Sequence, residues 1–412
     1  MAQVHHEATP AFDLLVRRKP GVPAVTLGVY LPRNEFDPAG TSGLTALAIR
    51  SAIRGAAGLD AAGLAFAFER LGGSVSPTIG LDWVGFGVTV LASNLGRAAA
   101  LLDQVLHQPT FAGPSILAER QMLFEETSQV ADDMYRYPFQ LAFASAYGDQ
   151  GYGVPAYGWP AEIAALEPAL VKEWYARTML ARRGVVIAVG DLDPEAALAE
   201  LAPVFGRYEA RTASPLVTPV AWAAGSGLPA RVVERDKAQS AFALAFPGPS
   251  RRAPDRHAAE VWSAVASGLG GRLFEALRDK RSLAYTVVAT SWQKARGGAF
   301  LSYIATSPER EAEAREEMLK ELGRFAGEPV SADELSRAVN YLAGQTDVGR
   351  QSAAAVAGEI LDAWLAGPGL EELVDPAAAY RTVTAEDVRA VAERVLAAGF
   401  AEGVVRGKGG GK

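Results

Sequence analysis

The chain has 412 residues, 49% of them hydrophobic and 21% charged, which is ordinary for a folded globular protein and argues against extensive disorder. At roughly 100–200 residues per domain, this length predicts two to four domains. Because 47 acidic residues outnumber 40 basic ones, the chain lacks the overall positive field that attracts nucleic acids and anionic membranes. The absence of cysteine excludes disulfides, thiolate metal sites and a cysteine nucleophile, and no apolar run reaches the roughly 18 residues that span a bilayer.

Apolar residues alternate with polar ones in several short stretches and recur at a helical period in others. Ser331 and Thr384 are each followed three residues later by an acidic residue, which indicates helix starts of the capping-box type. Meandering strands followed by helices predict an α+β fold of antiparallel-rich sheets covered by helices, rather than a doubly wound parallel sheet. In chain order, the predicted elements are strands over 23–32 and 84–92, a helix over 94–108, strands over 183–191, 240–248 and 299–306, and helices over 309–326 and 385–398.

The sequence contains an internal repeat. DWVGFGVTVLASN resembles RGGAFLSYIATSP, so that Phe86 falls on Phe300 at a separation of 214 residues. Near the ends of the two halves the separation drifts to 217 residues, where Gly190 matches Gly407. Such an ordered series predicts two copies of one domain. The predicted organisation is a first domain over 1–210, an Ala/Pro/Ser/Gly-rich linker over 211–230, a second domain over 231–407 and a flexible tail over 408–412.

The segment GLGGRLFEALRDKRSLAYTV at 268–287 is the most informative for chemistry. Glycines precede an amphipathic helix predicted over 272–280, the cations Arg278 and Arg281 lie near its end, and Tyr285 opens a strand. A purely structural interpretation has the cations favouring a helix C-terminus and the tyrosine packing its ring. A phosphate-binding loop is a poor interpretation, because no Gly-Lys-Ser/Thr follows the glycines.

This segment resembles the second-domain signature of the pitrilysin/insulinase-type zinc peptidases, also called inverzincins, which include two-chain bacterial and mitochondrial processing forms. Further stretches resemble the same family: GTSGLTALAIRS at 40–51, AYGDQGYGVPAYGWPAEIAAL at 146–166 and RGVVIAVGDLDPE at 183–195. The resemblance covers roughly residues 12–407. It implies two homologous domains that together form half of a clam-shell.

The metal motif of the family is lost in this chain. Active members carry His-x-x-Glu-His, in which two histidines one turn apart bind zinc and the glutamate is the general base. Matched on the leading Gly-Leu, these three positions are Ala46, Ile49 and Arg50. Glu126, or its neighbour Glu125, is comparable to the distal zinc ligand, but one carboxylate does not hold zinc. The chain's own histidines do not replace the motif, since they are isolated or adjacent rather than on one helix face: His5, His6, His107 and His257.

Non-catalytic subunits of two-chain family members lack the metal motif but keep an arginine and a tyrosine seven residues apart in the second domain. Arg278 and Tyr285 have this spacing, and Arg281 is the rival for the arginine position. The resemblance implies that the pair hydrogen-bonds the substrate peptide near the scissile bond. A guanidinium offers several donors to a carbonyl, and a phenol can donate to a developing oxyanion.

We therefore expect a non-catalytic, substrate-binding subunit of a heterodimeric zinc metalloendopeptidase, which is not a peptidase by itself. We expect this chain to bind no cofactor, and we expect zinc on a partner subunit bearing His-x-x-Glu-His. The other expected partners are unfolded peptides, with no nucleic acid and no membrane. The alternative is a structural, core-type subunit of a larger assembly without a role in proteolysis. The expected compartment is the bacterial periplasm, with the leader absent from this sequence, or the cytoplasm.

Overall fold

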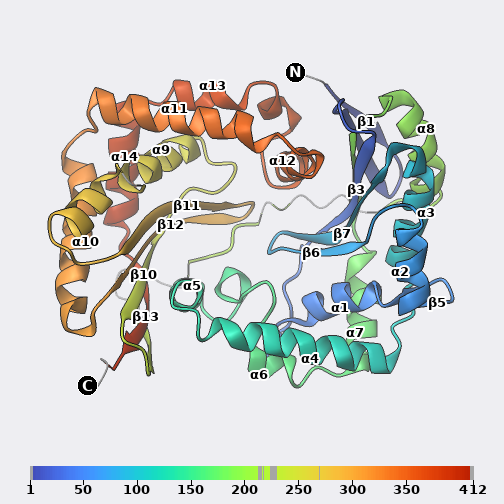
Figure 1. Ribbon diagram of the computed structural model, residues 1–412, viewed down its shortest axis with the longest axis horizontal. Coiled ribbons are helices and arrows are strands. Elements are labelled where there is room, and N and C mark those ends of the chain that lie inside the picture. Colours follow the sequence, from blue (N-terminus) through green and yellow to red (C-terminus); the bar gives the residue numbers. More distant parts are fainter. Residues whose placement is uncertain (1–2, 212–215, 217, 223–229, 269, 409–412) are drawn as a thin grey trace. The chain divides into compact units, whose positions relative to one another are not determined.

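The computed structural model describes residues 3–211, 216, 218–222, 230–268 and 270–408 (Figure 1). The chain packs as two compact units, each assembled from three segments. Unit 1 comprises Met1–Ser128, Pro155–Leu216 and Gly349–Val374, and unit 2 comprises Gln129–Val154, Val217–Val348 and Asp375–Lys412. Parts of the linker and tail predicted over 211–230 and 408–412 lie outside the described residues. No described helix has the length and hydropathy required to cross a membrane.

Unit 1 is built on a six-stranded sheet in the order β1-β2-β8-β3-β7-β6. The pair β2/β8 is parallel and the other pairs are antiparallel. The predicted strands over 23–32, 84–92 and 183–191 correspond to β3, β7 and β8. The strands are β1 (Val4–Ala8), β2 (Phe12–Arg18), β3 (Ala24–Pro32), β6 (Ser76–Ile79), β7 (Trp83–Leu91) and β8 (Gly184–Gly190).

Unit 2 repeats this topology in a five-stranded sheet of order β11-β12-β10-β13-β9. Its strands β9, β13, β10, β12 and β11 pair in the same order and the same directions as β2, β8, β3, β7 and β6. Phe86 and Phe300 lie in the equivalent strands β7 and β12, so the predicted α+β fold with two similar sheets is confirmed. The strands are β9 (Arg231–Arg235), β10 (Ser240–Pro247), β11 (Thr286–Lys294), β12 (Gly297–Thr306) and β13 (Ala401–Gly407).

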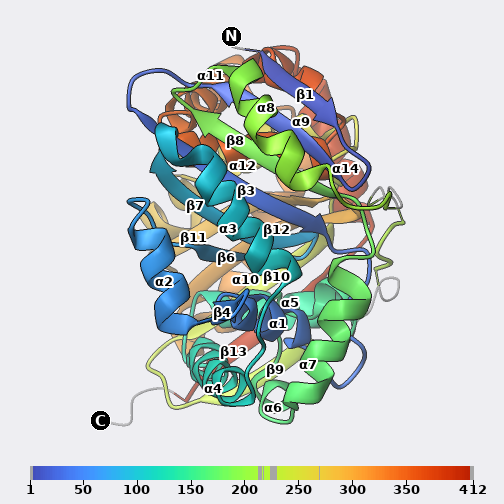
Figure 2. The same cartoon turned by 90° about the vertical axis from the view of Figure 1, so that its right-hand side faces the viewer.

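Helices cover both faces of the unit 1 sheet. On one face lie α3 (Leu95–His107) and α8 (Pro194–Phe205), which Figure 2 shows in front of the strands. On the other face lies α12 (Ala353–Leu365). Alternate residues of β8 join the two cores: Val186 packs in the cluster beneath α3 and α8, whereas Ile187 packs in the cluster with α12. A strand covered on both faces is apolar throughout, which explains the continuous apolar run at this point of the sequence.

The unit 2 sheet is covered on one face by α9 (Arg256–Ala266), α10 (Glu311–Gly327) and α14 (Ala385–Ala397), and on the other by α5 (Arg136–Tyr147). The approach of α5 to β13 is close, because a Cβ built on Gly403 would lie 2.2 Å from the carbonyl oxygen of Pro138. Only glycine leaves room there.

Each half of the sequence thus sends one helix to the sheet of the other half. Helix α5 precedes every strand of the second sheet in the chain and packs on that sheet, while α12 lies between β12 and β13 in the chain and packs on the first sheet. The packing units are therefore discontinuous in sequence, whereas the repeat describes duplicated halves. The domain boundaries at 210 and 231 remain a prediction from the repeat.

The remaining elements complete the two units. The predicted helix starts are present: the side chains of Ser331 and Thr384 accept from the backbone N–H three residues later, and both carboxylates accept in return. The other elements are α1 (Leu44–Ala52), α2 (Ala61–Glu69), α4 (Gly113–Val130), α6 (Pro160–Ile163), α7 (Pro168–Trp174), α11 (Ala332–Gly349) and α13 (Pro376–Arg381), with the short strands β4 (Gly55–Ala56) and β5 (Leu59–Asp60).

Candidate functional site

Helix α1 in unit 1 carries Ala46, Ile49 and Arg50, the three positions that the sequence comparison above matches to the metal motif. Ala46 and Ile49 are fully buried in the apolar core of the unit. The helix is fixed from outside its own sequence, since the carboxylate of Asp37 accepts hydrogen bonds from the backbone N–H groups of Gly43 and Thr45. Two of the three motif positions therefore serve packing rather than chemistry.

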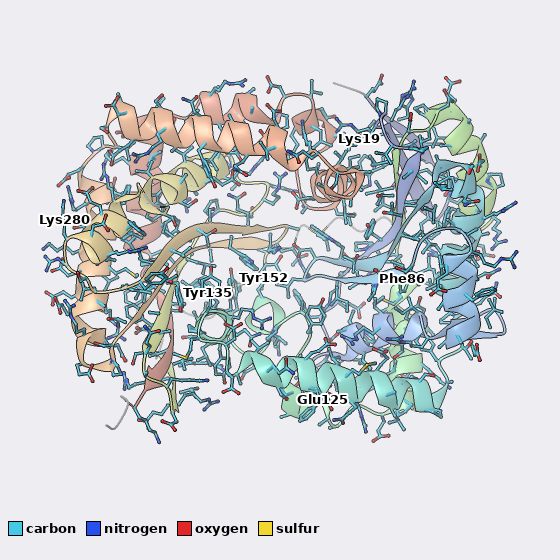
Figure 3. All side chains as sticks on the ribbon, in the orientation of Figure 1. Lys19, Phe86, Glu125, Tyr135, Tyr152 and Lys280 are labelled. Carbon is cyan, nitrogen blue, oxygen red and sulfur yellow. The ribbon has the colours of Figure 1, made fainter. Side chains whose placement is uncertain are left out.

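The third position, Arg50, forms a network of ion pairs with α4. Its Nη1 and Nη2 donate to the two carboxylate oxygens of Glu126 at 2.6 and 3.0 Å, and its Nε donates to Glu119 at 2.9 Å. These hydrogen bonds hold the pKa of the Glu126 carboxyl below its usual value. Glu119 is only 1% exposed and also pairs with Arg54. Of the two candidate glutamates, Glu126 thus contacts α1, whereas Glu125 accepts a hydrogen bond from Gln121 on the same helix (Figure 3).

Sequence reasoning overlooked Glu119. It lies seven residues before Glu126 on α4, a spacing that places both side chains on one helix face. An arginine at a former ligand position implies that acidic neighbours surround it, because a buried cation requires compensation. That signal would have pointed to the second carboxylate.

These residues do not fit a zinc ion. The two carboxylates that face α1 are already neutralised by guanidinium groups, and the other two motif positions offer no donor atom. Within the residues that the structure describes, no group of three or more His, Asp or Glu side chains is placed to hold a metal. A zinc site needs three or four such ligands.

We therefore expect the purified chain to contain far less than one equivalent of zinc. The measurement is elemental analysis after dialysis against zinc and then against metal-free buffer. The Glu126→Ala variant is the matched control, and its zinc content should equal that of the wild type. One zinc per wild-type chain, lost in this variant, would contradict our interpretation of α1.

The second candidate site lies in unit 2, where Arg278 and Tyr285 are in contact. Arg278 belongs to a π-helical stretch (Phe274–Asp279), where a regular α-helix is expected from the sequence; such stretches are frequent at functional sites. The guanidinium carbon of Arg278 lies 4.7 Å from the ring centroid of Tyr285 and 4.4 Å from that of Phe274. Tyr285 is 77% exposed, unusual for a large aromatic side chain.

The other cations of the cluster have carboxylate partners. Arg281 pairs with Glu317 at 3.0 Å, and Lys280 pairs with Glu275 at 2.7 Å. In the described part of the chain Arg278 has no such partner. Its contacts with the two aromatic rings are not hydrogen bonds, so its N–H groups remain available to a carbonyl oxygen.

The turn between Arg278 and Tyr285 is held in a strained conformation. Ser282 has φ of 50°, in the left-handed region that is costly for a residue other than glycine. Arg310 donates to the carbonyl oxygens of Ser282 at 2.9 Å and Arg281 at 3.2 Å, and Thr306 Oγ1 donates to that of Leu283 at 2.6 Å. Three backbone carbonyls are thus anchored by side chains of neighbouring elements.

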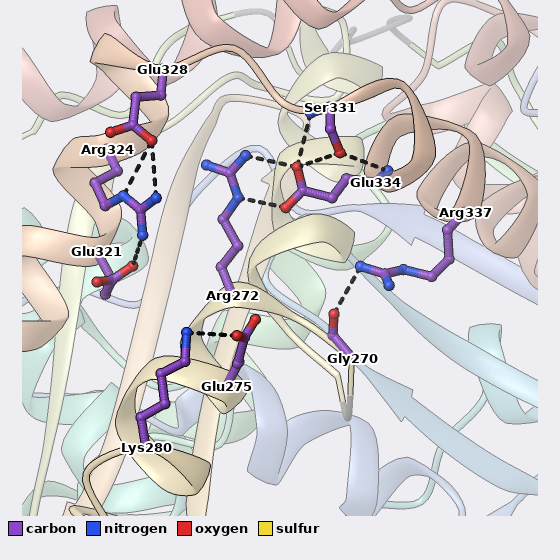
Figure 4. Close-up of polar contacts among 10 residues, drawn as sticks. All are labelled: Gly270, Arg272, Glu275, Lys280, Glu321, Arg324, Glu328, Ser331, Glu334 and Arg337. Carbon is purple, nitrogen blue, oxygen red and sulfur yellow. Dashed lines mark hydrogen bonds and ion pairs between the residues drawn. The ribbon is translucent and has the colours of Figure 1, made fainter.

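The helical segment that carries Arg278 borders a cavity of about 490 Å³ (Figure 4). Arg272 donates to Glu334 from Nε at 2.6 Å and from Nη2 at 2.8 Å. This pairing and the hydrogen bonds from Ser331 lower the pKa of Glu334 from 4.5 to about 2. The cavity is lined by charged and small residues: Arg272, Glu275, Ala276, Lys280, Arg281, Glu321, Arg324, Ser331 and Glu334.

The depressed pKa of Glu334 predicts an acid-sensitive contribution to stability. A carboxyl whose pKa is lower in the folded state stabilises the fold above pH 4.5, and this contribution is lost as the pH falls towards about 2. The shift corresponds to about 3 kcal/mol, which solvent screening reduces to about 2 kcal/mol. Glu334→Gln should lower the free energy of unfolding by that amount at neutral pH and progressively less in acid.

Urea unfolding at several pH values measures this difference. Glu275→Gln is the control, because Glu275 pairs with Lys280 on the surface, where the two side chains are 61% and 67% exposed. A constant difference between wild type and Glu334→Gln from neutral pH down to about pH 2 would refute the assignment.

Comparison with known proteins shows what the chain is similar to. Residues 165–342 match the family described as the peptidase M16 inactive domain. An uncharacterized zinc protease of Streptomyces coelicolor is 26% identical over 385 residues, which cover 92% of this chain and 83% of that protein. A peptidase M16 inactive domain from Pseudomonas fluorescens superposes with a TM-score of 0.88 at 21% identity, covering 100% of this chain and 99% of the other.

A chain of complex III2 from Candida albicans, solved with Inz-5 bound, also has the same fold. Its TM-score is 0.81 at 15% identity, with coverage of 98% of this chain and 96% of that one. At these identities the two solved structures show the fold alone. The region 165–342 is thus similar to the inactive domain of the M16 peptidase family, and relatives of the chain are named as zinc proteases.

Proposed function

We propose that this chain is the non-catalytic, substrate-binding subunit of a heterodimeric zinc metalloendopeptidase. The observation that carries the proposal is the contact between Arg278, which no described carboxylate neutralises, and the exposed ring of Tyr285. This chain supplies these two side chains to an unfolded peptide substrate. A partner of the same family supplies His-x-x-Glu-His and the zinc ion.

The proposed roles of the two subunits follow from the two candidate sites, the one on α1 and the one at Arg278 and Tyr285. Arg50 and its carboxylate partners leave α1 without metal chemistry, so hydrolysis needs another chain. Arg278 and Tyr285 need no metal, because hydrogen-bond donors aimed at a carbonyl or at a developing oxyanion act directly. Each donor that strengthens in the transition state contributes about 2.7–4 kcal/mol.

The test is cleavage of a quenched fluorescent peptide library by three samples. These are this chain alone, a His-x-x-Glu-His family chain from the same source, and an equimolar mixture. We expect this chain to be inactive and the mixture to exceed the metal-bearing chain by a large factor. Chelator-sensitive cleavage by this chain alone would overturn the proposal.

The alternative function is a structural subunit, and the fold shared with a chain of complex III2 favours it. A scaffold needs the fold and its surfaces but not Arg278 or Tyr285. In the same experiment it would leave the activity of the metal-bearing chain unchanged while forming a stable complex with it. The activity of the mixture therefore distinguishes the two functions, and size-exclusion chromatography verifies that the complex has formed.

A further inference from the structure

Arg272 opens the helical segment that carries Arg278, six residues before it. Its guanidinium forms a two-pronged pair with the carboxylate of Glu334, and its Cζ lies 4.6 Å from the ring centroid of Phe325. The side chain is 14% exposed. Arg272 thus joins the beginning of the segment to α11 through Glu334, as Figure 4 shows. It also joins the segment to α10 through Phe325.

The Glu334 carboxylate also accepts hydrogen bonds from Ser331, the residue that precedes α11. One of its oxygens accepts from the backbone N–H of Ser331 at 2.8 Å and from the Ser331 hydroxyl at 2.9 Å. From the next turn of α11, Arg337 donates to the carbonyl oxygen of Gly270 at 2.8 Å, immediately before the segment. The Glu334 carboxylate is therefore held in place by contacts that do not involve Arg272.

The other ion pairs around the cavity are of a different kind. Lys280 and Glu275 are 67% and 61% exposed, and Arg324 is 46% exposed where it bonds Glu321 and Glu328. Exposed pairs contribute little to structure, whereas a mostly buried, two-pronged arginine–carboxylate pair fixes geometry. The Arg272–Glu334 pair alone among these connects the Arg278 segment to α11 by such a contact in the described residues.

The segment needs an external anchor because it is short and irregular. Its π-helical stretch covers only Phe274–Asp279, so its own hydrogen bonds define its axis poorly. Arg310 fixes the carbonyls at the far end of the segment, as described above. At the near end, Arg337 holds the carbonyl of Gly270, and Arg272 is the residue of the segment itself that is anchored to α11.

We propose that the Arg272–Glu334 ion pair is a positioning device that sets the place of the Arg278 guanidinium over the Tyr285 ring. This inference rests on the function proposed above, in which that guanidinium binds the substrate. Arg272 and Glu334 do not touch the peptide; they act through Arg278. Breaking the pair lets the segment shift, and a displacement of about 1 Å at a substrate-binding group costs up to about 100-fold in rate.

The variants are Arg272→Lys, which keeps the charge but loses the fork of donors, and Glu334→Gln, which keeps an acceptor for the Ser331 N–H. Each should lower kcat/KM of the two-chain complex about 10- to 100-fold. Lys280→Gln, on the same segment, is the matched control and should stay within about twofold of wild type. In the Arg278→Ala background, Arg272→Lys should cause no further loss, because a device that acts through Arg278 has nothing left to position.

Hydrogen exchange of the chain without its partner gives a readout independent of catalysis. Amides between 272 and 285 should exchange faster in Arg272→Lys and Glu334→Gln, while those of β10 and β12 keep the wild-type rate. If Arg278→Ala itself leaves kcat/KM unchanged, the proposed function fails. If Arg278→Ala lowers it but both pair variants behave as wild type, or their losses add fully to that of Arg278→Ala, the positioning role alone fails.

Discussion

Arg278→Ala is expected to lower kcat/KM of the two-chain peptidase by about 100-fold or more, because it removes donors aimed at the substrate near the bond that breaks. Tyr285→Phe keeps the ring beneath the guanidinium and removes only the hydroxyl, so a smaller loss of about 10-fold is expected. Steady-state cleavage of a single fluorogenic peptide, with the metal-bearing partner held constant, gives both values.

Arg281→Ala is the matched control for this experiment. Arg281 is the neighbouring cation, and its pairing with Glu317 assigns it to a contact within the protein. It should change kcat/KM by no more than about twofold. Size-exclusion chromatography should show each variant still bound to the partner. Wild-type kinetics in both Arg278→Ala and Tyr285→Phe would remove the substrate-binding role.

The second large effect is expected on stability. Arg50→Met should lower the free energy of unfolding by about 3 kcal/mol, because it withdraws a cation from the nearly fully buried carboxylate of Glu119. Arg54 still reaches Glu119 but is 42% exposed, so it compensates only in part. Urea denaturation, with the slope of the transition compared between variants, measures the loss.

Two further variants make this prediction specific. Glu126→Gln should cost less than about 1 kcal/mol, since Glu126 is 56% exposed and can be solvated. Adding Glu119→Gln to Arg50→Met should recover a large part of the loss, because the uncompensated charge is then gone. Equal losses from Arg50→Met and Glu126→Gln, or no recovery in the double variant, would show that Arg50 does not balance a buried carboxylate.

Much of the local structure follows from sequence patterns. The capping boxes at Ser331 and Thr384 and the strands β3, β7, β8, β10 and β12 lie where the patterns place them. The repeat that matches Phe86 with Phe300 also predicts that the two sheets share one topology. The capping boxes depend on hydrogen bonds within a few residues, and the strands are visible because the alternation of apolar side chains along a short stretch records which of them face a core.

Local sequence patterns do not determine which cation of the Arg278 segment has a carboxylate partner. The sequence predicts an amphipathic helix over 272–280 and leaves Arg278 and Arg281 as rivals for one position. The structure distinguishes them, because α10 offers Glu317 to Arg281 and leaves Arg278 beside Tyr285. Which cation has a carboxylate depends on how a helix from a later part of the chain packs, and no local spacing encodes that.

The sequence by itself determined the duplicated α+β fold, the absence of His and Glu at positions 46, 49 and 50, and the seven-residue spacing of Arg278 and Tyr285. Only the tertiary structure decided that α5 and α12 exchange sheets and that Arg50 reaches Glu126, 76 residues away. The reason is physical. Periodicity and capping reflect neighbours along the chain, whereas ion pairs and helix exchange depend on which distant surfaces meet once the core is closed.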